Sequence, residues 1–484
     1  MIPYGSIKFG WASAEDEGAS DPNLLLAGFF DINGISGEAR EGRKFLVLGY
    51  KGSGKSALSE HLRLTADSDP QFFAIPTFLA DFPYHDFARL FPGDDPQAKF
   101  PTAWAWLLLV RLFESLSQDE GRDPNTEFEK AVDVLAKLGV LPNRSLREVV
   151  LTSTTRTFRV KLPVVFESEF RRDRHEQILK FPYYVEHLKA IIKNMRSRSQ
   201  HLLIVDGLDD IFTAEKIQYD SLASLLLEVS RLNAMFAKEN VPAKILLLCR
   251  TDLFEKLPGA NKNKLRQDSA INLDWYHDPR QPGESNLVRL VNLKARVTDN
   301  SLADVFAAYF PPQMRLRGGR GRRVFRQSIV PHLLEFTRHT PRDFIQVLTH
   351  IQPFDAADQS SGLIRRRLRE DQVQSGLRSY SIDYFLPEIK DELVGYFPAS
   401  VVEAAFSLIG SLRKREFTFK ELCSKAEEQP RFSELDIPGI VSALFECSAI
   451  GNVNSARSRR GAVYYTWKQE PKLYARSPRE TPAP

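Results

Sequence analysis

Eight consecutive residues at positions 49–56 read Gly-Tyr-Lys-Gly-Ser-Gly-Lys-Ser and combine three glycines with a lysine and a terminal hydroxyl. Glycines allow a tight turn whose backbone N–H groups aim inward, where they can surround a polyphosphate. Lys55 is placed to reach the β- and γ-phosphates, and the Ser56 hydroxyl to bind Mg²⁺. This segment therefore predicts a binding loop for a nucleoside triphosphate, taken to be ATP, together with magnesium.

A second candidate group follows the apolar run His201–Asp206, which predicts a buried strand that ends in a carboxylate. We expect Asp206 to lie beside the phosphate loop and to hold Mg²⁺, usually through water. Gly207 comes next, so a general base has to stand further along. Asp209 or Asp210 could orient the attacking water, or either could be an ordinary turn or helix-capping carboxylate.

Two arginines complete the candidate chemistry. Arg250 follows the apolar run Lys244–Leu248, and at the end of such a strand its guanidinium could stabilise charge as the phosphoryl group departs. Arg342 falls in the first turn of a helix that Pro341 begins, where it could sense the γ-phosphate from a lid. A surface salt bridge for Arg250 and an exposed helix-capping position for Arg342 are the alternatives.

The predicted site residues fall into three groups by role. The catalytic group is Lys55, Asp206, Asp209, Asp210 and Arg250. The nucleotide-binding group is Gly49, Lys51, Gly52, Ser53, Gly54, Lys55, Ser56, Ala57 and Arg342. The magnesium ligands are Ser56 and Asp206.

These residues need a scaffold that the surrounding sequence supplies. The apolar run Lys44–Leu48 precedes the loop, and leucines at helical spacing follow it, which is the strand–loop–helix context that the motif requires. Further apolar runs at Phe72–Phe78, His201–Asp206 and Lys244–Leu248 alternate with helical patterns. Such a chain predicts an α/β fold whose parallel sheet is covered on both faces.

The domain organisation is expected to follow the same pattern. Residues 1–285 form the phosphate-loop core, with an insertion at about 120–200 that contains a β-hairpin at Thr152–Phe170. Residues 286–390 form a helical lid. Residues 395–475, with three helices and then two strands, follow the plan of a winged-helix domain, and 476–484 form a disordered tail.

Composition excludes some classes of protein. The net charge of +4 over 484 residues argues neither for nor against nucleic acid as a partner. The three cysteines have no metal-ligand spacing and form no disulfide framework, which fits a reducing compartment. No apolar run reaches the roughly 20 residues that a membrane helix needs, and no secretory signal opens the chain, so we expect a cytoplasmic protein without membrane contact.

In order along the chain, Gly49–Ser56, Leu202–Asp210, Arg250 and Pro341–Asp343 resemble the motifs of AAA+ and STAND-type ATPases. The stretches Leu46–Ser56 and Arg250–Phe254 are similar to a group of bacterial P-loop ATPases, many from mobile or anti-phage defence loci. This resemblance implies an ATP-hydrolysing switch or oligomeric motor that acts with an effector protein, and a subunit interface that adds an arginine such as Arg266.

Two departures from the STAND pattern stand out. No histidine follows His350, so the histidine that holds ADP in the winged helix is absent or that contact is built differently. No repeat-rich sensor domain is visible, so any sensor must be residues 120–200 or a separate partner chain.

Basic segments leave a nucleic-acid partner open. One patch contains no acidic residue, and its members are Arg315, Arg317, Arg320, Arg322, Arg323 and Arg326; a smaller group is Arg457, Arg459 and Arg460. Both suit a polyanion, but a flexible basic insertion or a protein-docking loop explains them equally. In the expected recognition helix Ile437–Ser448 the only charged residue is Glu446, which disfavours groove reading. A nucleic-acid-dependent ATPase and a non-hydrolysing ATP-dependent scaffold are the rival functions.

Overall fold

The structure is a computed structural model, and it describes a set of segments that covers most of the chain. They are residues 2–79, 82–89, 96–142, 145–154, 181–208, 216–259, 262–275, 285–317, 324–359, 367–394, 396–414, 416–432, 435–455 and 463–466. They divide into two compact units. The sheet unit holds the described residues from Ser13 to Asp274, and the C-terminal unit holds residues 2–12 with those from Trp275 onward.

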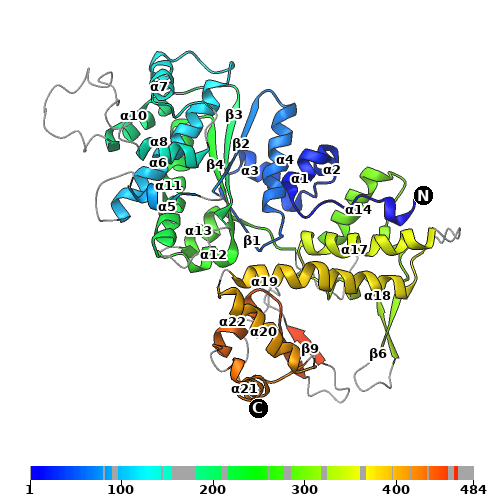
Figure 1. Cartoon of the computed structure of the whole chain (residues 1–484). Helices are drawn as coiled ribbons and strands as arrows, with labels where there is room; N and C mark the ends of the chain where they lie inside the picture. Colours follow the sequence, from blue (N-terminus) through cyan, green and yellow to red (C-terminus); the bar gives the residue numbers. More distant parts are fainter. Residues whose placement is uncertain are drawn as a thin grey trace. The chain divides into compact units, whose positions relative to one another are not determined.

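The sheet unit is a five-stranded parallel sheet with helices on both faces (Figure 1). Its strands are β1 (Leu46–Gly49), β2 (Phe72–Phe78), β3 (Gln200–Asp206), β4 (Ala243–Arg250) and β5 (Ala270–Asn272). Its helices are α1 (Ala14–Ser20), α2 (Pro22–Ala27), α3 (Ile35–Glu41), α4 (Lys55–Ser68), α5 (Tyr84–Arg89), α6 (Pro96–Ser117), α7 (Thr126–Lys137), α8 (Leu146–Thr154), α10 (Phe181–Lys193), α11 (Lys216–Glu239), α12 (Thr251–Lys256) and α13 (Lys262–Ser269).

The strand order is β2-β3-β4-β1-β5, so the chain does not place consecutive strands side by side. From β1 it crosses to the far edge at β2, returns through β3 and β4, and then passes β1 to add β5. The strands predicted from apolar runs are all present, whereas the three-residue β5 was not predicted, because so short a segment carries too little pattern.

Different helices pack against the two faces of the sheet. Leu203, Val205, Ile245 and Leu247 belong to one core cluster with residues of α6, α10, α11 and α12. Because side chains alternate along a strand, the intervening residues of β3 and β4 face the other way, toward α4, which contacts four of the strands. Nearly complete burial of β3 and β4 explains why they appear in sequence as continuous apolar runs.

A buried Ser115–His201–Asp119 cluster ties α6 to the start of β3. His201 Nδ1 lies 2.7 Å from Ser115 Oγ, and His201 Nε2 lies 3.2 Å from Asp119 Oδ2. Burial lowers the pKa of His201, which keeps the ring neutral. The three residues are at most 3% exposed, so this serine–histidine–aspartate arrangement is closed to substrate and acts in packing.

The C-terminal unit is mainly helical. Its helices are η1 (Tyr4–Ser6), α14 (Asn286–Thr298), α15 (Val305–Tyr309), α16 (Ile329–Leu334), α17 (Pro341–Gln359), α18 (Glu370–Ser379), η6 (Tyr380–Phe385), α19 (Leu386–Val394), α20 (Ala399–Ser411), α21 (Phe419–Glu427), η7 (Pro430–Phe432) and α22 (Ile437–Glu446). Two antiparallel pairs complete it, formed by β6 (Gln313–Arg317) with β7 (Val324–Ser328) and by β8 (Asn452–Ser455) with β9 (Val463–Thr466).

Two sequence predictions need correction. The β-hairpin expected at Thr152–Phe170 begins within α8, which runs to Thr154, and the rest of that segment lies outside the described residues. Leu146, Val149, Val150 and Ser153 are buried along one face of α8, and this helical packing includes the first residues of the expected hairpin. Residues 313–328, expected within a helical lid, contain the antiparallel pair β6–β7. The alternation of Met314, Arg315, Leu316 and Arg317 has the period of a strand.

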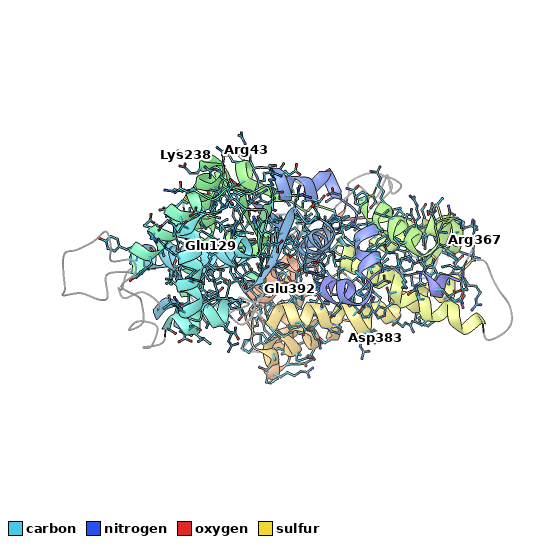
Figure 2. All side chains as sticks on the ribbon, turned by 90° about the horizontal axis from the view of Figure 1, so that it is seen from above. Arg43, Glu129, Lys238, Arg367, Asp383 and Glu392 are labelled. Carbon is cyan, nitrogen blue, oxygen red and sulfur yellow. The ribbon has the colours of Figure 1, made fainter. Side chains whose placement is uncertain are left out.

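A buried ion network joins α17 to α19 in the C-terminal unit. Arg338 donates to both carboxylate oxygens of Asp343 at 2.8 Å and to Glu392 Oε2 at 3.1 Å; Figure 2 labels Glu392 on α19. Burial by itself would raise the pKa of Asp343, but the adjacent guanidinium holds it below its ordinary value. Thr340 caps the helix by accepting from the Asp343 N–H, so the predicted start of α17 at Pro341 is confirmed.

Asp343→Asn should lower the free energy of unfolding by about 3–5 kcal/mol, because it leaves the buried Arg338 charge without its bidentate partner. Urea unfolding followed by circular dichroism measures the loss. Asp391→Asn, on the exposed side of α19, is the matched control and should leave the midpoint unchanged. Equal midpoints for the two variants would contradict the role assigned to this network.

Candidate functional site

The carboxyl ends of β1 and β4 lie at a switch point of the sheet. These strands are neighbours, yet β1 leads into α4 on one face of the sheet, whereas β4 leads into α12 on the other face (Figure 1). Neighbouring strands whose following segments pass to opposite faces form a switch point, and open α/β sheets bind ligands at such points. The residues at this switch point are those of the loop after β1 and Arg250 at the end of β4.

The predicted phosphate loop, residues 49–56, joins β1 to α4 in the strand–loop–helix order that the sequence indicates. It leaves β1 at Gly49, turns with the Ser53 N–H donating to Tyr50 O at 3.1 Å, and enters α4 at Lys55. Gly52 and Gly54 have φ values of 79° and 93°, a region that side-chain-bearing residues rarely adopt. Gly54 is the N-cap of α4, so the open amide groups and the positive end of the helix dipole face the loop.

Lys55 is folded back over this loop. Its side chain is buried, and Nζ lies 3.4 Å from Gly49 O and 3.5 Å from Tyr50 O. These contacts are longer than an ordinary charge-assisted hydrogen bond, so phosphate oxygens can replace them readily. Ser56 and Ala57, in the first turn of α4, are half-buried and border the same loop.

Asp206 lies on the α4 side of the sheet. Leu203 and Val205 face the opposite helices, and alternation along β3 therefore turns Asp206 toward the face that carries Ser56. Its carboxylate is 3% exposed and accepts from the Gly207 N–H at 2.7 Å. The strand of Asp206 is not adjacent to β1, because β4 lies between them.

Arg250, at the end of β4, lies on the strand between that of Asp206 and that of the loop. It pairs with Gly49 in the register of β4 with β1, and it is 4% exposed. Its guanidinium is held by Asp252, with Nε to Oδ1 at 3.0 Å and Nη2 to Oδ2 at 2.7 Å. Burial raises the pKa of Asp252, but the charge and hydrogen bonds of Arg250 outweigh burial and lower it overall. Arg250 is thus oriented within the site and does not lie on the surface.

Asp252 is a site residue that sequence reasoning did not select. The sequence contained a signal for Asp252, because an acidic residue two positions after Arg250 can pair with it at the start of α12. Leu273, which follows β5, is a second one: its N–H donates to Leu48 O at 2.7 Å, and its Cβ would lie 3.2 Å from a side chain added at Gly49. The sequence did not predict the contact between Leu273 and Leu48, since it depends on the pairing of β5 with β1.

The other predicted site residues fall elsewhere. Arg342 lies in the first turn of α17 in the C-terminal unit, and its role at the nucleotide stays a prediction. Arg266, the candidate for action across a subunit interface, forms a 3.4 Å ion pair with Glu255 at the surface of the sheet unit. Asp209 and Asp210, the tip arginines Arg320, Arg322 and Arg323, the group Arg457, Arg459 and Arg460, and the tail 476–484 lie outside the described residues.

The chain matches no protein-family model and no curated protein. Among the described residues, every helix is too short or too polar to cross a membrane.

Gly54→Ala tests the loop geometry directly. The added Cβ meets open space, but the backbone angle of 93° is strained for alanine by about 1–2 kcal/mol. We expect nucleotide affinity to fall at least tenfold while the circular dichroism spectrum stays unchanged, as measured by titration with a fluorescent ATP analogue. Gly37→Ala, in α3 and also surrounded by open space, is the control and should bind like the parent protein. Equal affinities would show that the turn does not need glycine.

Proposed function

We propose that this protein binds ATP with Mg²⁺ and hydrolyses it, as a switch or oligomeric motor of the AAA+/STAND kind. The observation that carries the proposal is the meeting of the phosphate loop, Asp206 and Arg250 at the carboxyl ends of neighbouring strands. A glycine-rich turn without a ligand would not be expected at the switch point of a parallel sheet. It would also not be expected together with a buried carboxylate and a buried arginine on the same face.

Each residue has a defined task in this proposal. The amide groups of residues 52–56 and the amino end of α4 surround the β- and γ-phosphates, and Lys55 exchanges its carbonyl contacts for phosphate oxygens. Arg250, from the strand between Asp206 and the loop, stabilises negative charge on the departing phosphoryl group. Asp209 and Asp210 remain the two candidates to orient the attacking water.

Magnesium fits the donors present on the α4 face. The Ser56 hydroxyl and the Asp206 carboxylate would hold it, and the remaining ligands would be phosphate oxygens and water, as is usual for Mg²⁺. Bound there, the ion would supply positive charge at the β- and γ-phosphates.

We interpret α20, α21, α22 and the β8–β9 pair as a winged-helix domain that transmits the nucleotide state. The order of three helices and then an antiparallel pair supports this interpretation. In α22 the only charged residue is Glu446, and the helix offers no lysine, arginine, asparagine or glutamine to a DNA groove. We therefore assign its output to protein assembly, with a further copy of this chain and an effector protein as partners, in a cytoplasmic protein of an anti-phage defence system.

Phosphate release from ATP tests the activity. Lys55→Ala should abolish ATP binding and turnover together, because it removes the charge that the loop presents. Asp206→Asn should still bind ATP but lose turnover by a factor on the order of 10² or more, since the metal ligand acts mainly on the transition state. Lys238→Ala, at the exposed end of α11, is the control (Figure 2). A parent protein without turnover, alone or with partners, would refute the motor proposal.

Arg250 and Asp252 are predicted to act as a pair. Arg250→Ala should lower kcat by about 10²–10³ with a small change in KM, because the guanidinium acts on developing charge. Asp252→Asn should lower kcat less, since it only loosens the orientation of Arg250. The double variant should be no slower than Arg250→Ala alone. Additive losses in kcat would contradict the prediction, because they would show that Asp252 does not act through Arg250. Arg43→Ala, an exposed arginine before the opposite end of β1, is the control (Figure 2).

A further inference from the structure

We propose that the β6–β7 hairpin is an arginine arm that binds the phosphate backbone of nucleic acid without reading its sequence. This inference goes beyond the ATPase function and does not depend on it, because it concerns a separate element of the C-terminal unit. Figure 1 shows β6 projecting away from α18, and Arg315 and Arg326 of the two strands are exposed.

The pairing of the two strands brings like charges together. Arg315 stands directly opposite Arg326 in the antiparallel register, and opposite residues have Cβ atoms only about 5 Å apart. Facing positive charges destabilise a hairpin unless an anion lies near them. Any anion near this pair, from the chain or from a bound polyanion, therefore stabilises the hairpin.

One acidic residue partly neutralises this pair. Glu370, at the start of α18, accepts from Arg315 Nε and from the Arg315 N–H, both at 3.1 Å. Burial raises the pKa of Glu370, but hydrogen bonds from Arg315 and the charges of Arg315 and Arg326 lower it overall. The single negative charge of Glu370 therefore neutralises only one of the two arginine charges, and the group keeps a net positive charge. The Arg315 side chain remains 67% exposed despite the ion pair.

The base of the hairpin is anchored. Met314 is completely buried, and the Ile329 N–H donates to Pro312 O at 3.2 Å where the two strands end. Gln327 donates to Glu335 Oε1 at 2.6 Å and contacts His332, so β7 is joined to α16 and the loop after it. The described arginines thus extend from a base that is held by hydrogen bonds and burial.

The composition of the segment points to phosphate. Residues 313–328 contain six arginines and no lysine, aspartate or glutamate. Arginine matches phosphate with two parallel hydrogen bonds and is less strongly hydrated than lysine, which makes it the preferred residue for nucleic-acid backbones. Contacts of this kind position a nucleic acid but carry no information about its sequence. A two-stranded ribbon also has the width that the major groove of DNA admits.

Binding to fluorescently labelled duplex DNA, single-stranded DNA and RNA, measured by anisotropy without nucleotide, tests the arm. The double variant Arg315→Ala/Arg326→Ala should bind at least about tenfold more weakly, to the same extent for unrelated sequences. The slope of log affinity against log salt should fall by about two, one for each phosphate contact removed. Arg378→Ala removes one positive charge at the other end of α18 and should change little.

Glu370→Gln provides the opposite test. Removal of the neutralising carboxylate should strengthen binding several-fold, an effect that damage to the fold would not produce. Arg315→Lys/Arg326→Lys keeps the charge, should fold if the alanine variant does not, and should bind with intermediate affinity because lysine lacks the bidentate geometry. Failure of all three nucleic acids to bind at low salt would overturn the proposal. So would equal affinities of the double alanine variant and Arg378→Ala, or preferential binding of an acidic polypeptide such as polyglutamate.

Discussion

The departure of neighbouring strands to opposite faces of the sheet is the constraint on which the candidate site depends. After β1 the chain passes to α4, and after β4 it passes to α12 on the other side, so the carboxyl ends of both strands form a switch point of the sheet. The loop after β1 and the amino end of α4, which has no side-chain cap, lie at this switch point. An anion bound there would satisfy donors that a helix cannot satisfy within itself. Charge and open backbone groups are therefore concentrated at one edge of an otherwise apolar sheet.

The alternation of side chains along β3 and β4 then determines which polar groups meet. Leu203, Val205, Ile245 and Leu247 contribute to the core on one face, and this leaves Asp206 and Arg250 on the side of α4. Both are almost fully buried, a condition that charged residues tolerate when they are paired or hydrogen-bonded. Asp252 meets that need for Arg250 and fixes its direction at the same time. The same alternation of side chains thus buries the sheet and places the polar residues of the candidate site.

The C-terminal unit holds charge in two different ways. Arg338 and Asp343 are buried and bidentate, and they join the start of α17 to α19, the helix that precedes the proposed winged helix. Arg315 and Arg326 are exposed on a hairpin, and Glu370 lies near both. The first arrangement satisfies its charges internally and fixes the fold. The second leaves a positive excess in contact with solvent, where an external anion can bind.

The sequence by itself determined the phosphate loop, four of the five strands and the start of α17, because Gly49–Ser56, the apolar runs and Thr340–Pro341 act over a few neighbouring residues. It also supplied Asp206 and Arg250 as candidates. Only the tertiary structure decided that β4 separates Asp206 from the loop, that Asp252 orients Arg250, and that Arg315 faces Arg326 across a hairpin. Strand order and cross-strand register join residues distant in the chain. Local patterns cannot encode them, because the same apolar runs are compatible with several sheet topologies.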